Sequence, residues 1–301
     1  MPSKRFLFMK DAGQTKVDSL KKVVVLGNCM AERLQYLLAA YPGFTDSFQL
    51  VPTRAIHTLS DLEQWQALAE KALACHYIFT QPLFRFGPCN TAALRQQAGN
   101  AQRLILFSSP DFKAYFPDAI VLRNKHKLRI TPVLDWDSSI IFSCFVRGVP
   151  VFDVEALYLE HRLFQAEAMD KKIASAIDSC ELHEQGLDLS TRDFVMRNYA
   201  QTRLFHSPRH PVDALILLML RKMALVLGLQ AGVPLPAVAG FGFNRWPVIT
   251  RHHRHFAFAE QKHFVIAGKE FSLEDIAMAY YNFYDFHPHV VEANLDQVIE
   301  L

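Results

Sequence analysis

A run of β-branched residues that ends at a Gly-Asn pair and passes directly into an amphipathic segment is the strongest constraint on the fold. Residues 22–26 read Lys-Val-Val-Val-Leu, which predicts a short buried strand. After a turn at Gly27 and Asn28, residues 30–40 predict a helix. Cys29 therefore lies at a helix N-terminus, where unpaired N–H groups and the helix dipole favour negative charge. This setting favours a reactive thiolate, or a phosphate or oxyanion held by the same N–H groups. The alternative interpretation is an inert thiol packed beneath the helix.

Strands and helices alternate throughout the N-terminal part of the chain. Strands are predicted at 22–26, 48–52, 76–80 and 103–107, and helices at 30–40, 59–74 and 90–98. This alternation indicates βαβ units and a mostly parallel sheet. In such sheets, ligands bind beyond the carboxyl ends of the strands. The residues that follow predicted strand ends, and that we expect at one crevice, are Cys29, Thr53-Arg54, Gln81-Pro82 and Ser108-Ser109.

The C-terminal part is predicted to be largely helical, with helices at 137–147, 153–182, 191–200, 211–229, 272–285 and 288–299. Asp153 and Ser272 suit N-caps, the latter with Asp275 three residues on, and Pro211 suits a first helical turn. A hairpin is expected within 256–267. The predicted fold class is α/β, with a small, mostly parallel sheet in the N-terminal half and a largely helical C-terminal half. We expect a tail over 1–20, an α/β subdomain over 21–135, and a helical subdomain over 136–301 that packs on it and completes the site.

Composition excludes several classes of function. The net charge of the 301 residues is only +2, with no long basic block, which argues against nucleic-acid binding through a general positive field. The five cysteines are widely spaced with no CxxC pair, which disfavours a disulfide framework or a cysteine zinc site and suits a reducing compartment. The longest apolar run, 214–220, is too short to span a bilayer, and the apolar patch at 6–9 is too short for a signal peptide. We therefore expect a cytoplasmic protein without a membrane span.

One single histidine and one cluster of histidines are candidates for catalysis or ligand binding. His210 stands between Pro208 and Pro211, immediately before a predicted long helix, so its ring is held in place. A thiol paired with an imidazole is the usual requirement for thiol nucleophilic catalysis. The cluster is His252, His253 and His255, which alternate with Arg251 and Arg254 and are followed by His263. No carboxylate or cysteine stands at ligand spacing there, so we expect an exposed cationic loop that contacts phosphate groups, and no metal. The nucleotide and hydrolase motifs GxGxxG, GxSxG and HExxH and the P-loop are absent.

Four segments taken in order resemble one known family. They are Gly27-Asn28-Cys29, Gln81-Pro82, Tyr115-Phe116-Pro117-Asp118 and His210-Pro211. Together they resemble the WcbI family of capsular polysaccharide biosynthesis proteins over residues 22–215. Met30 departs from the pattern, which commonly has glutamine after the cysteine. The resemblance implies an acyl (acetyl) transferase that uses coenzyme A or acetyl-coenzyme A and modifies a sugar, nucleotide-sugar or glycan acceptor. It also implies an SGNH-like α/β subdomain, with the Gly-Asn-Cys turn and His210 at the positions of that pattern's nucleophile and histidine; no Asp is identified as a third member.

On this interpretation Cys29 and His210 are catalytic. His210 deprotonates a sugar hydroxyl, and Cys29 either carries the acyl group or lines the thioester pocket. Backbone N–H groups near Cys29, with the Asn28 side chain, hold the oxyanion. Residues expected to contact the cofactor are Gly27, Asn28, Arg54, Gln81, Ser109, Lys113, Tyr115 and Arg209. One alternative is an SGNH-like esterase or deacetylase, against which a thiol in place of serine counts. Another is a non-catalytic ligand-binding protein of a glycan assembly system.

Overall fold

The computed structural model describes residues 20–130, 133–234 and 244–301. Its internal contacts group the chain into two compact units. Unit 1 comprises Met1–Ser108, Leu187–Leu189 and Leu217–Ala237, and unit 2 comprises Ser109–Gly186, Ser190–Ile216 and Val238–Leu301. The first division therefore falls after Ser108, whereas the predicted boundary is at residue 135. Two later segments, Leu187–Leu189 and Leu217–Ala237, return to unit 1. The tail predicted over 1–20 lies outside the described residues except for Leu20.

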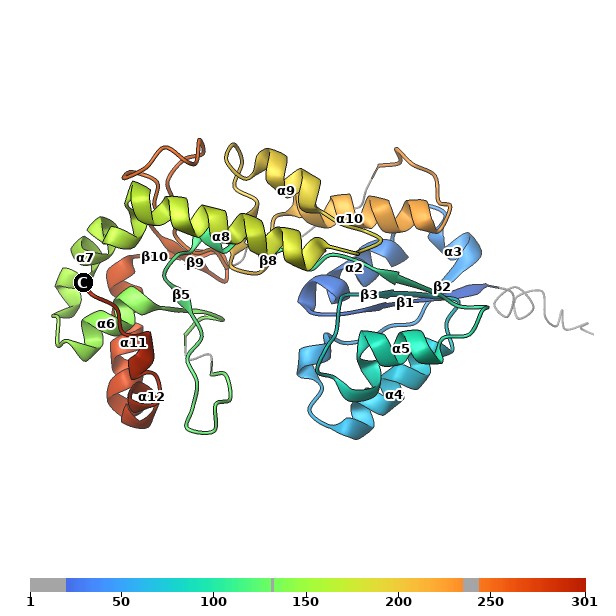
Figure 1. The fold of residues 1–301 in the computed structure, drawn as a ribbon, viewed down its shortest axis with the longest axis horizontal. Helices are drawn as coiled ribbons and strands as arrows, with labels where there is room; N and C mark the ends of the chain where they lie inside the picture. The colour runs from blue at the N-terminus through green and yellow to red at the C-terminus, as the bar shows by residue number, and fades with distance from the viewer. Residues whose placement is uncertain (1–19, 131–132, 235–243) are drawn as a thin grey trace, which may run out of the picture. The chain divides into compact units, whose positions relative to one another are not determined.

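Unit 1 is built on a parallel sheet of four strands in the order β2-β1-β3-β4 (Figure 1). The strands are β1 (Lys21–Leu26), β2 (Phe48–Leu50), β3 (Tyr77–Thr80) and β4 (Arg103–Leu106). Val23, Val24 and Val25 of β1 are fully buried, as expected for the central position of that strand. The four predicted strands and their parallel arrangement are confirmed, with ends that differ by one or two residues.

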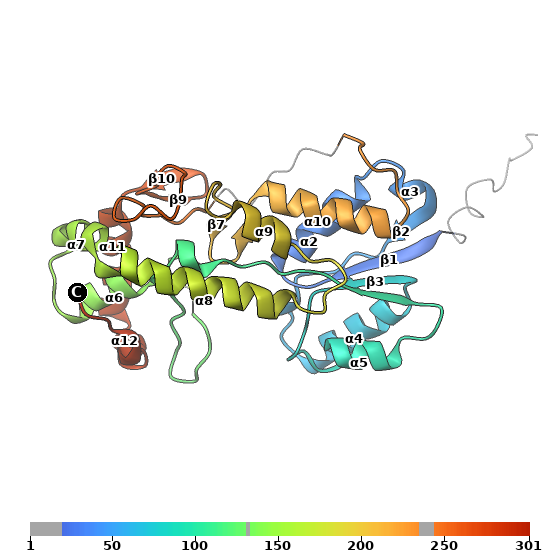
Figure 2. The ribbon, with the colours of Figure 1, turned by 45° about the horizontal axis from the view of Figure 1, so that its top comes forward.

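Helices cover both faces of this sheet (Figures 1 and 2). They are α2 (Cys29–Ala39), α3 (Phe44–Ser47), α4 (Leu62–Leu73) and α5 (Thr91–Gln97), with 3₁₀ turns η1 (Ile56–Thr58) and η2 (Gly87–Cys89). Helices α4 and α5 lie on one face and α2 on the other. Leu68 and Ala72 of α4 join Val24, Leu26 and Ile78 of the sheet in one buried cluster. This packing fixes the turns that leave the carboxyl ends of the strands.

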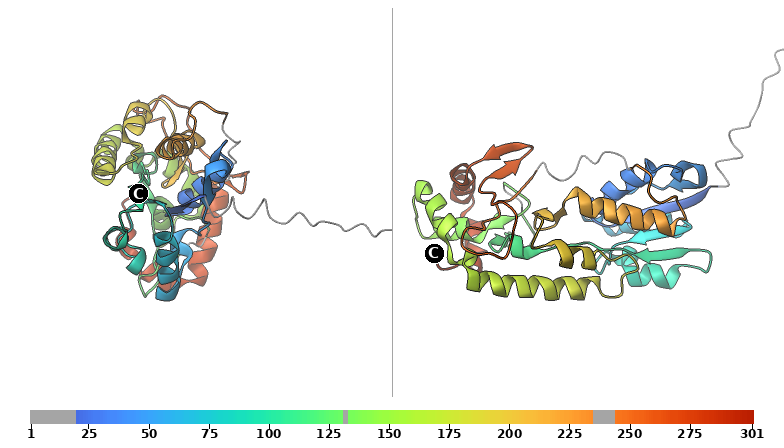
Figure 3. Two further views of the ribbon diagram at one scale, coloured as in Figure 1. Left: turned by 90° about the vertical axis from the view of Figure 1, so that its right-hand side faces the viewer. Right: turned by 90° about the horizontal axis from the view of Figure 1, so that it is seen from above.

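Unit 2 is mainly helical and has its own large apolar core. Its helices are α6 (Ser139–Val146), α7 (Val154–Glu160), α8 (Ala166–Glu184), α9 (Arg192–Asn198), the start of α10 (Asp213–Val226), α11 (Leu273–Phe286) and α12 (Pro288–Glu292), with 3₁₀ turns η3 (Lys113–Tyr115), η4 (Val151–Asp153), η5 (Arg162–Phe164) and η7 (Leu295–Gln297). Three antiparallel strand pairs accompany them: β5 (Ala119–Ile120) with β6 (Asp137–Ser138), β7 (Phe205–Ser207) with β8 (His210–Pro211), and β9 (Phe264–Ile266) with β10 (Lys269–Phe271). Helix α8 is the longest helix among the described residues (Figure 3).

Two predicted helices are wrong in extent, for identifiable reasons. The helix expected over 153–182 is interrupted at His161, where the chain passes from α7 to α8. The backbone of His161 is extended, and its ring accepts the Leu163 N–H at 3.1 Å. The helix expected over 288–299 ends at Glu292, because the Asn294 amide donates to the backbone oxygens of Arg123 and Val290, both at 2.7 Å. His161 Nε2 also lies 2.8 Å from the distant backbone oxygen of Glu300, so long-range contacts override helical periodicity at both places.

Local signals at other element ends have mixed outcomes. Ser272 and Asp275 form the predicted capping box of α11, whereas Asp153 makes no capping hydrogen bond. The hairpin expected within 256–267 is displaced: β9 and β10 are joined at Ala267 and Gly268, both with positive φ, as a two-residue hairpin turn requires. No helix of the described residues is both long and apolar enough to cross a bilayer.

Candidate functional site

Cys29 is the first residue of α2 and directly follows the turn that leaves β1. Asn28 is the N-cap, and its Oδ1 accepts the Met30 N–H at 2.9 Å. Cys29 is half-buried, whereas the other four cysteines are buried. Burial raises the thiol pKa to about 11 for Cys75, Cys89 and Cys144 and to about 12 for Cys180. Cys29 is therefore the one cysteine whose position suits chemistry on a bound ligand.

The side chain of Gln81, which follows β3, holds this turn. Its Oε1 accepts the Asn28 N–H at 2.8 Å, and its Nε2 donates to Asn28 Oδ1 at 3.2 Å. Gly27 has φ of 156°, and a Cβ there would lie 2.4 Å from Gln81 Oε1. Only glycine leaves room for this amide, so the structure brings Gly27, Asn28, Cys29 and Gln81 together. Gln81 is 3% exposed, and its amide is directed at the turn itself.

The segment after β2 is fixed in a similar way and borders a groove. Gln35 of α2 binds Thr53 with both amide atoms: Nε2 donates to Thr53 Oγ1 at 2.9 Å, and Oε1 accepts the Thr53 N–H at 2.8 Å. The next residue, Arg54, lines a groove of about 610 Å³ between α2 and α4. Lys71 also lines it and donates to the backbone oxygen of Pro52 at 2.6 Å. This volume is in the range of small-molecule sites, about 300–1,000 Å³.

The groove begins close to the cysteine. Glu32, one helical turn after Cys29, lines the groove, as does Tyr36 one turn further, which is 66% exposed. Apolar side chains of Leu59 and Leu68 complete its lining. The sequence interpretation found Arg54 but missed Tyr36 and Lys71, because on a helix both conform to an ordinary amphipathic pattern.

His210 belongs to unit 2 and lies in β8, three residues before α10 begins at Asp213. The prediction that it immediately precedes the helix, with Pro211 in the first turn, is wrong: both residues pair with β7, and the Val212 N–H donates to Leu204 O at 2.9 Å. Ser207 Oγ lies 2.8 Å from His210 Nδ1, and Asp135 Oδ2 lies 4.0 Å from Nε2.

Burial dominates the protonation of this ring. It lowers the pKa of His210 below its ordinary value, Asp135 partly restores it, and Arg129 lowers it further. The imidazole is therefore neutral near pH 7, as a general base must be. The sequence interpretation identified no carboxylate partner for His210, because Asp135 is remote in the chain and has no motif around it.

The remaining predicted cofactor residues also lie in unit 2. Ser109 is the first residue of unit 2 and is exposed. Tyr115 is 1% exposed, and its hydroxyl donates to Tyr199 O at 2.6 Å, so it packs within the core. Burial raises the pKa of this phenol well above its ordinary value. Lys113 is exposed beside Tyr115, and the Arg209 guanidinium lies 5.7 Å from the centre of the Trp136 ring.

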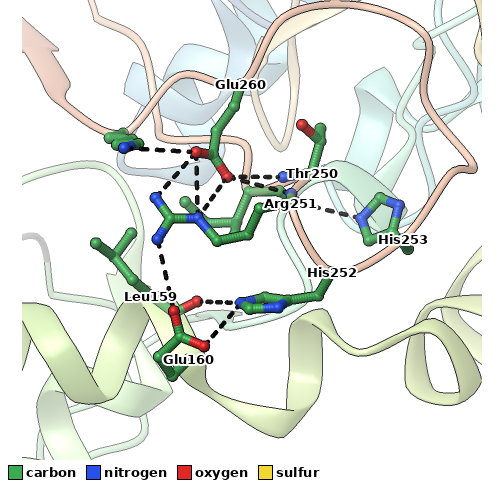
Figure 4. A network of polar contacts seen from close by, with 9 residues as sticks. Leu159, Glu160, Thr250, Arg251, His252, His253 and Glu260 are labelled. Carbon is green, nitrogen blue, oxygen red and sulfur yellow. Dashed lines mark hydrogen bonds and ion pairs between the residues drawn. The ribbon is translucent and has the colours of Figure 1, made fainter.

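The histidine-rich segment is held by paired charges (Figure 4). Arg251 binds Glu260 through Nη2 at 3.0 Å and lies 3.5 Å from Glu160, and His252 Nε2 lies 2.8 Å from Leu159 O. His253 is buried. Arg251 and Arg254 are exposed, as predicted, but the positive charge of Arg251 is matched by two carboxylates. In the part of the chain that the structure describes, no three His, Cys, Asp or Glu side chains gather to hold a metal ion.

Comparisons with known proteins agree on one family. The family model described as polysaccharide biosynthesis enzyme WcbI matches residues 22–232. A solved structure of WcbI, described as the native protein without a disulfide bond between coenzyme A and one of its cysteines, has a TM-score of 0.77 at 20% sequence identity. The match covers 92% of this chain and 94% of that chain, which shows that the fold is shared. No curated protein matches the chain. The chain belongs to the WcbI family of polysaccharide biosynthesis enzymes.

Proposed function

We propose that this protein is a coenzyme A-dependent acyltransferase, most simply an acetyltransferase, that modifies a sugar hydroxyl in the biosynthesis of a capsular or other surface polysaccharide. The observation that carries the proposal is the half-buried Cys29 on a rigid helix cap, one turn from a groove of about 610 Å³. The description of the structurally similar WcbI mentions coenzyme A together with a cysteine. Cys29 is our candidate for the corresponding position in this chain.

Unit 1 supplies the residues proposed to bind the cofactor. The thiol end of coenzyme A lies at Cys29, and its body follows the groove past Glu32 and Tyr36. Arg54 and Lys71 provide positive charge for phosphate groups, and the exposed Tyr36 ring provides a stacking surface. Gly27 and Gln81 hold the turn, so their proposed contribution is to position Cys29 and Asn28.

Unit 2 supplies the proposed base. Neutral His210 takes the proton from the acceptor hydroxyl as the hydroxyl oxygen attacks the acyl carbon, and Ser207, 2.8 Å from Nδ1, orients its ring. The Asp135 carboxylate, 4.0 Å from Nε2, favours the protonated ring that results. The bond between the acyl carbon and sulfur breaks, and the proton held by His210 passes to the leaving thiolate. In the covalent variant the Cys29 sulfur first attacks the thioester, and coenzyme A leaves as its thiolate and takes up the proton lost by Cys29. The acceptor hydroxyl then attacks the acyl carbon on Cys29, and the Cys29 thiolate leaves and takes the proton from His210. Otherwise Cys29 lines the pocket. The Asn28 amide is the proposed donor to the oxyanion.

Differential alkylation tests the cofactor site and the role of Cys29. In the free protein, iodoacetamide at neutral pH should label Cys29 first, because burial keeps the other four thiols protonated. Coenzyme A should protect it. Cys29→Ser should keep coenzyme A affinity in calorimetry; in the covalent variant it should lose most transfer, and the wild type should form an acetyl adduct. Cys89→Ser, on a buried thiol of the same unit, is the matched control for labelling.

Two results would contradict the proposal. The first is the absence of calorimetric binding of coenzyme A or acetyl-coenzyme A at millimolar concentration. The second is preferential labelling of a buried cysteine while Cys29 stays inert. Hydrolysis of acetyl-coenzyme A at the same rate with and without sugar acceptors would favour the esterase alternative. All five cysteines are free thiols, and we propose a reducing, cytoplasmic location for the enzyme.

A further inference from the structure

Unit 2 contains a small cavity that the proposed roles of Cys29 and His210 do not use. It has a volume of about 100 Å³. Phe116, Ala119, Trp136 and Pro208 give it apolar walls, and Lys113 and Lys172 line it as well. At about 30 Å³ per water molecule, it has room for about three waters, or for one tetrahedral anion.

The charges around this cavity favour an anion. Lys113 and Lys172 are exposed, and neither forms an ion pair with a carboxylate of the described residues. The guanidinium carbons of Arg129 and Arg209 lie 5.2 and 5.7 Å from the centre of the Trp136 ring, which itself lines the cavity. Two lysines therefore line one apolar pocket, and two arginines lie near the Trp136 ring of its wall. In such an apolar setting the attraction for an anion is less screened than in water.

Two carboxyl groups oppose this field only in part. Asp118 stands between two cavity-lining residues and is largely ionised at pH 7, because burial raises its pKa only to about 6. Its charge is partly taken up by the hydrogen bonds that Ser138 and Tyr158 donate to it and by the attraction of Lys172. Asp135 is exposed and lies beside His210. The cationic groups outnumber these carboxylates, so the net field at the cavity is positive.

We propose that this cavity binds a phosphate group of the sugar acceptor, which is thus a sugar phosphate or a nucleotide sugar. The inference rests on the proposed function, because it takes His210 as the base. Pro208 of the cavity wall is two residues before His210, a span of at most about 7 Å along the backbone. A sugar ring separates its own phosphate from its hydroxyls by such a span. The long pantetheine arm of coenzyme A keeps its phosphates away from the thioester, so a phosphate this close to the base belongs to the acceptor.

The test uses calorimetry with glucose 1-phosphate as the probe and glucose as its neutral counterpart. The wild type should bind glucose 1-phosphate and not glucose. Lys113→Gln and Lys172→Gln should each weaken this binding about tenfold, the loss of one charge-assisted hydrogen bond. Lys171→Gln is the matched control: Lys171 is the neighbouring residue on α8, exposed and paired with Glu167 at 2.9 Å, and its loss should leave binding unchanged. Lys172→Arg should restore most of the affinity.

Coenzyme A affinity, measured on the same variants, separates this inference from the proposed function. Lys113 lines the cavity of unit 2, so this inference assigns it to the acceptor phosphate in place of the cofactor contact expected from the sequence, and coenzyme A affinity should be unchanged by Lys113→Gln and Lys172→Gln. If it falls with the loss of either lysine, the phosphate belongs to coenzyme A, and the inference is overturned while the transferase proposal stands. No binding of glucose 1-phosphate at tens of millimolar, or equal weakening by Lys171→Gln, also overturns it. If coenzyme A fails to bind the wild type, the proposed function fails, but glucose 1-phosphate still reports on the cavity.

Discussion

The close approach of Gln81 to Gly27 predicts strong coupling between these two positions. Gln81→Ala removes two hydrogen bonds to Asn28, at 2.8 and 3.2 Å, and leaves the Asn28 N–H without this acceptor. At about 1 kcal/mol for each of the two bonds, and up to about 2 kcal/mol for a half-buried donor left unsatisfied, we expect a loss of about 2–4 kcal/mol in the free energy of unfolding. Gly27→Ala places a Cβ 2.4 Å from Gln81 Oε1 and 2.9 Å from Ala31 Cβ. Because it must displace the same amide, we expect a loss of about 3 kcal/mol.

The double variant should lose less than the sum of the two single losses. Once Gln81 is alanine, the amide that a Cβ at residue 27 would meet is gone, and only the Ala31 contact and the backbone strain at φ of 156° persist. We expect Gly27→Ala to cost about 1–2 kcal/mol in that background, so the coupling is about 1–2 kcal/mol. Urea denaturation of the four proteins measures it, with exposed Gln66→Ala as the control. Additivity within about 0.5 kcal/mol would refute the reasoning.

Three further predictions concern the proposed base His210 and helix α11. His210→Ala should lower turnover by about 10²–10⁴-fold, the usual contribution of a general base, with coenzyme A affinity unchanged in calorimetry. Because burial lowers the pKa of His210, its neutral form persists below pH 6.5; the acid limb of kcat/KM should have its midpoint below that pH, and a midpoint above it would contradict the assignment. Ser272→Ala should remove the capping box of α11 and lower the free energy of unfolding by about 1 kcal/mol, measured by denaturation.

Features encoded by neighbouring residues could be predicted from the sequence. The four parallel strands follow from short apolar runs, β-branched in β1, that alternate with helical segments, and the capping box at Ser272 follows from an acidic residue three positions later. The Asn28 cap is similarly local. The interruption at His161 could not be predicted, because it depends on how the ring is used: Nδ1 accepts the Leu163 N–H, and Nε2 contacts the backbone oxygen of Glu300 at 2.8 Å.

The partners of the candidate site residues depend on contacts between distant segments. The Gln81 amide meets Asn28 from 53 positions away, and a strand-end glutamine has no feature that predicts this pairing. Asp135 near His210 is equally remote in sequence. Tyr115 shows that a residue found through a motif can have a purely structural contact. It is part of the segment that resembles the family, yet its hydroxyl donates a hydrogen bond to the Tyr199 backbone oxygen within the core. A matched motif therefore identifies a position, while the tertiary structure decides what its side chain contacts.

The hydrogen bonds of Asn28 orient its amide and give a sharp test of its proposed role. Oδ1 accepts from both Met30 N–H and Gln81 Nε2, and the Asn28 N–H donates to Gln81, so the turn itself uses these groups. The Nδ2 group is the side-chain donor that we propose for the oxyanion.

Asn28→Asp keeps the accepting oxygen, and aspartate caps helices as well as asparagine does, so stability should change little. The variant replaces the donor with a negatively charged oxygen, and turnover should fall by at least about 10²-fold, as for the loss of an oxyanion donor. Asn90→Asp at the N-cap of α5, where Oδ1 accepts from Ala92 and Ala93, is the matched control and should keep full activity. Full activity in Asn28→Asp would exclude the amide from oxyanion binding and leave it a purely structural cap.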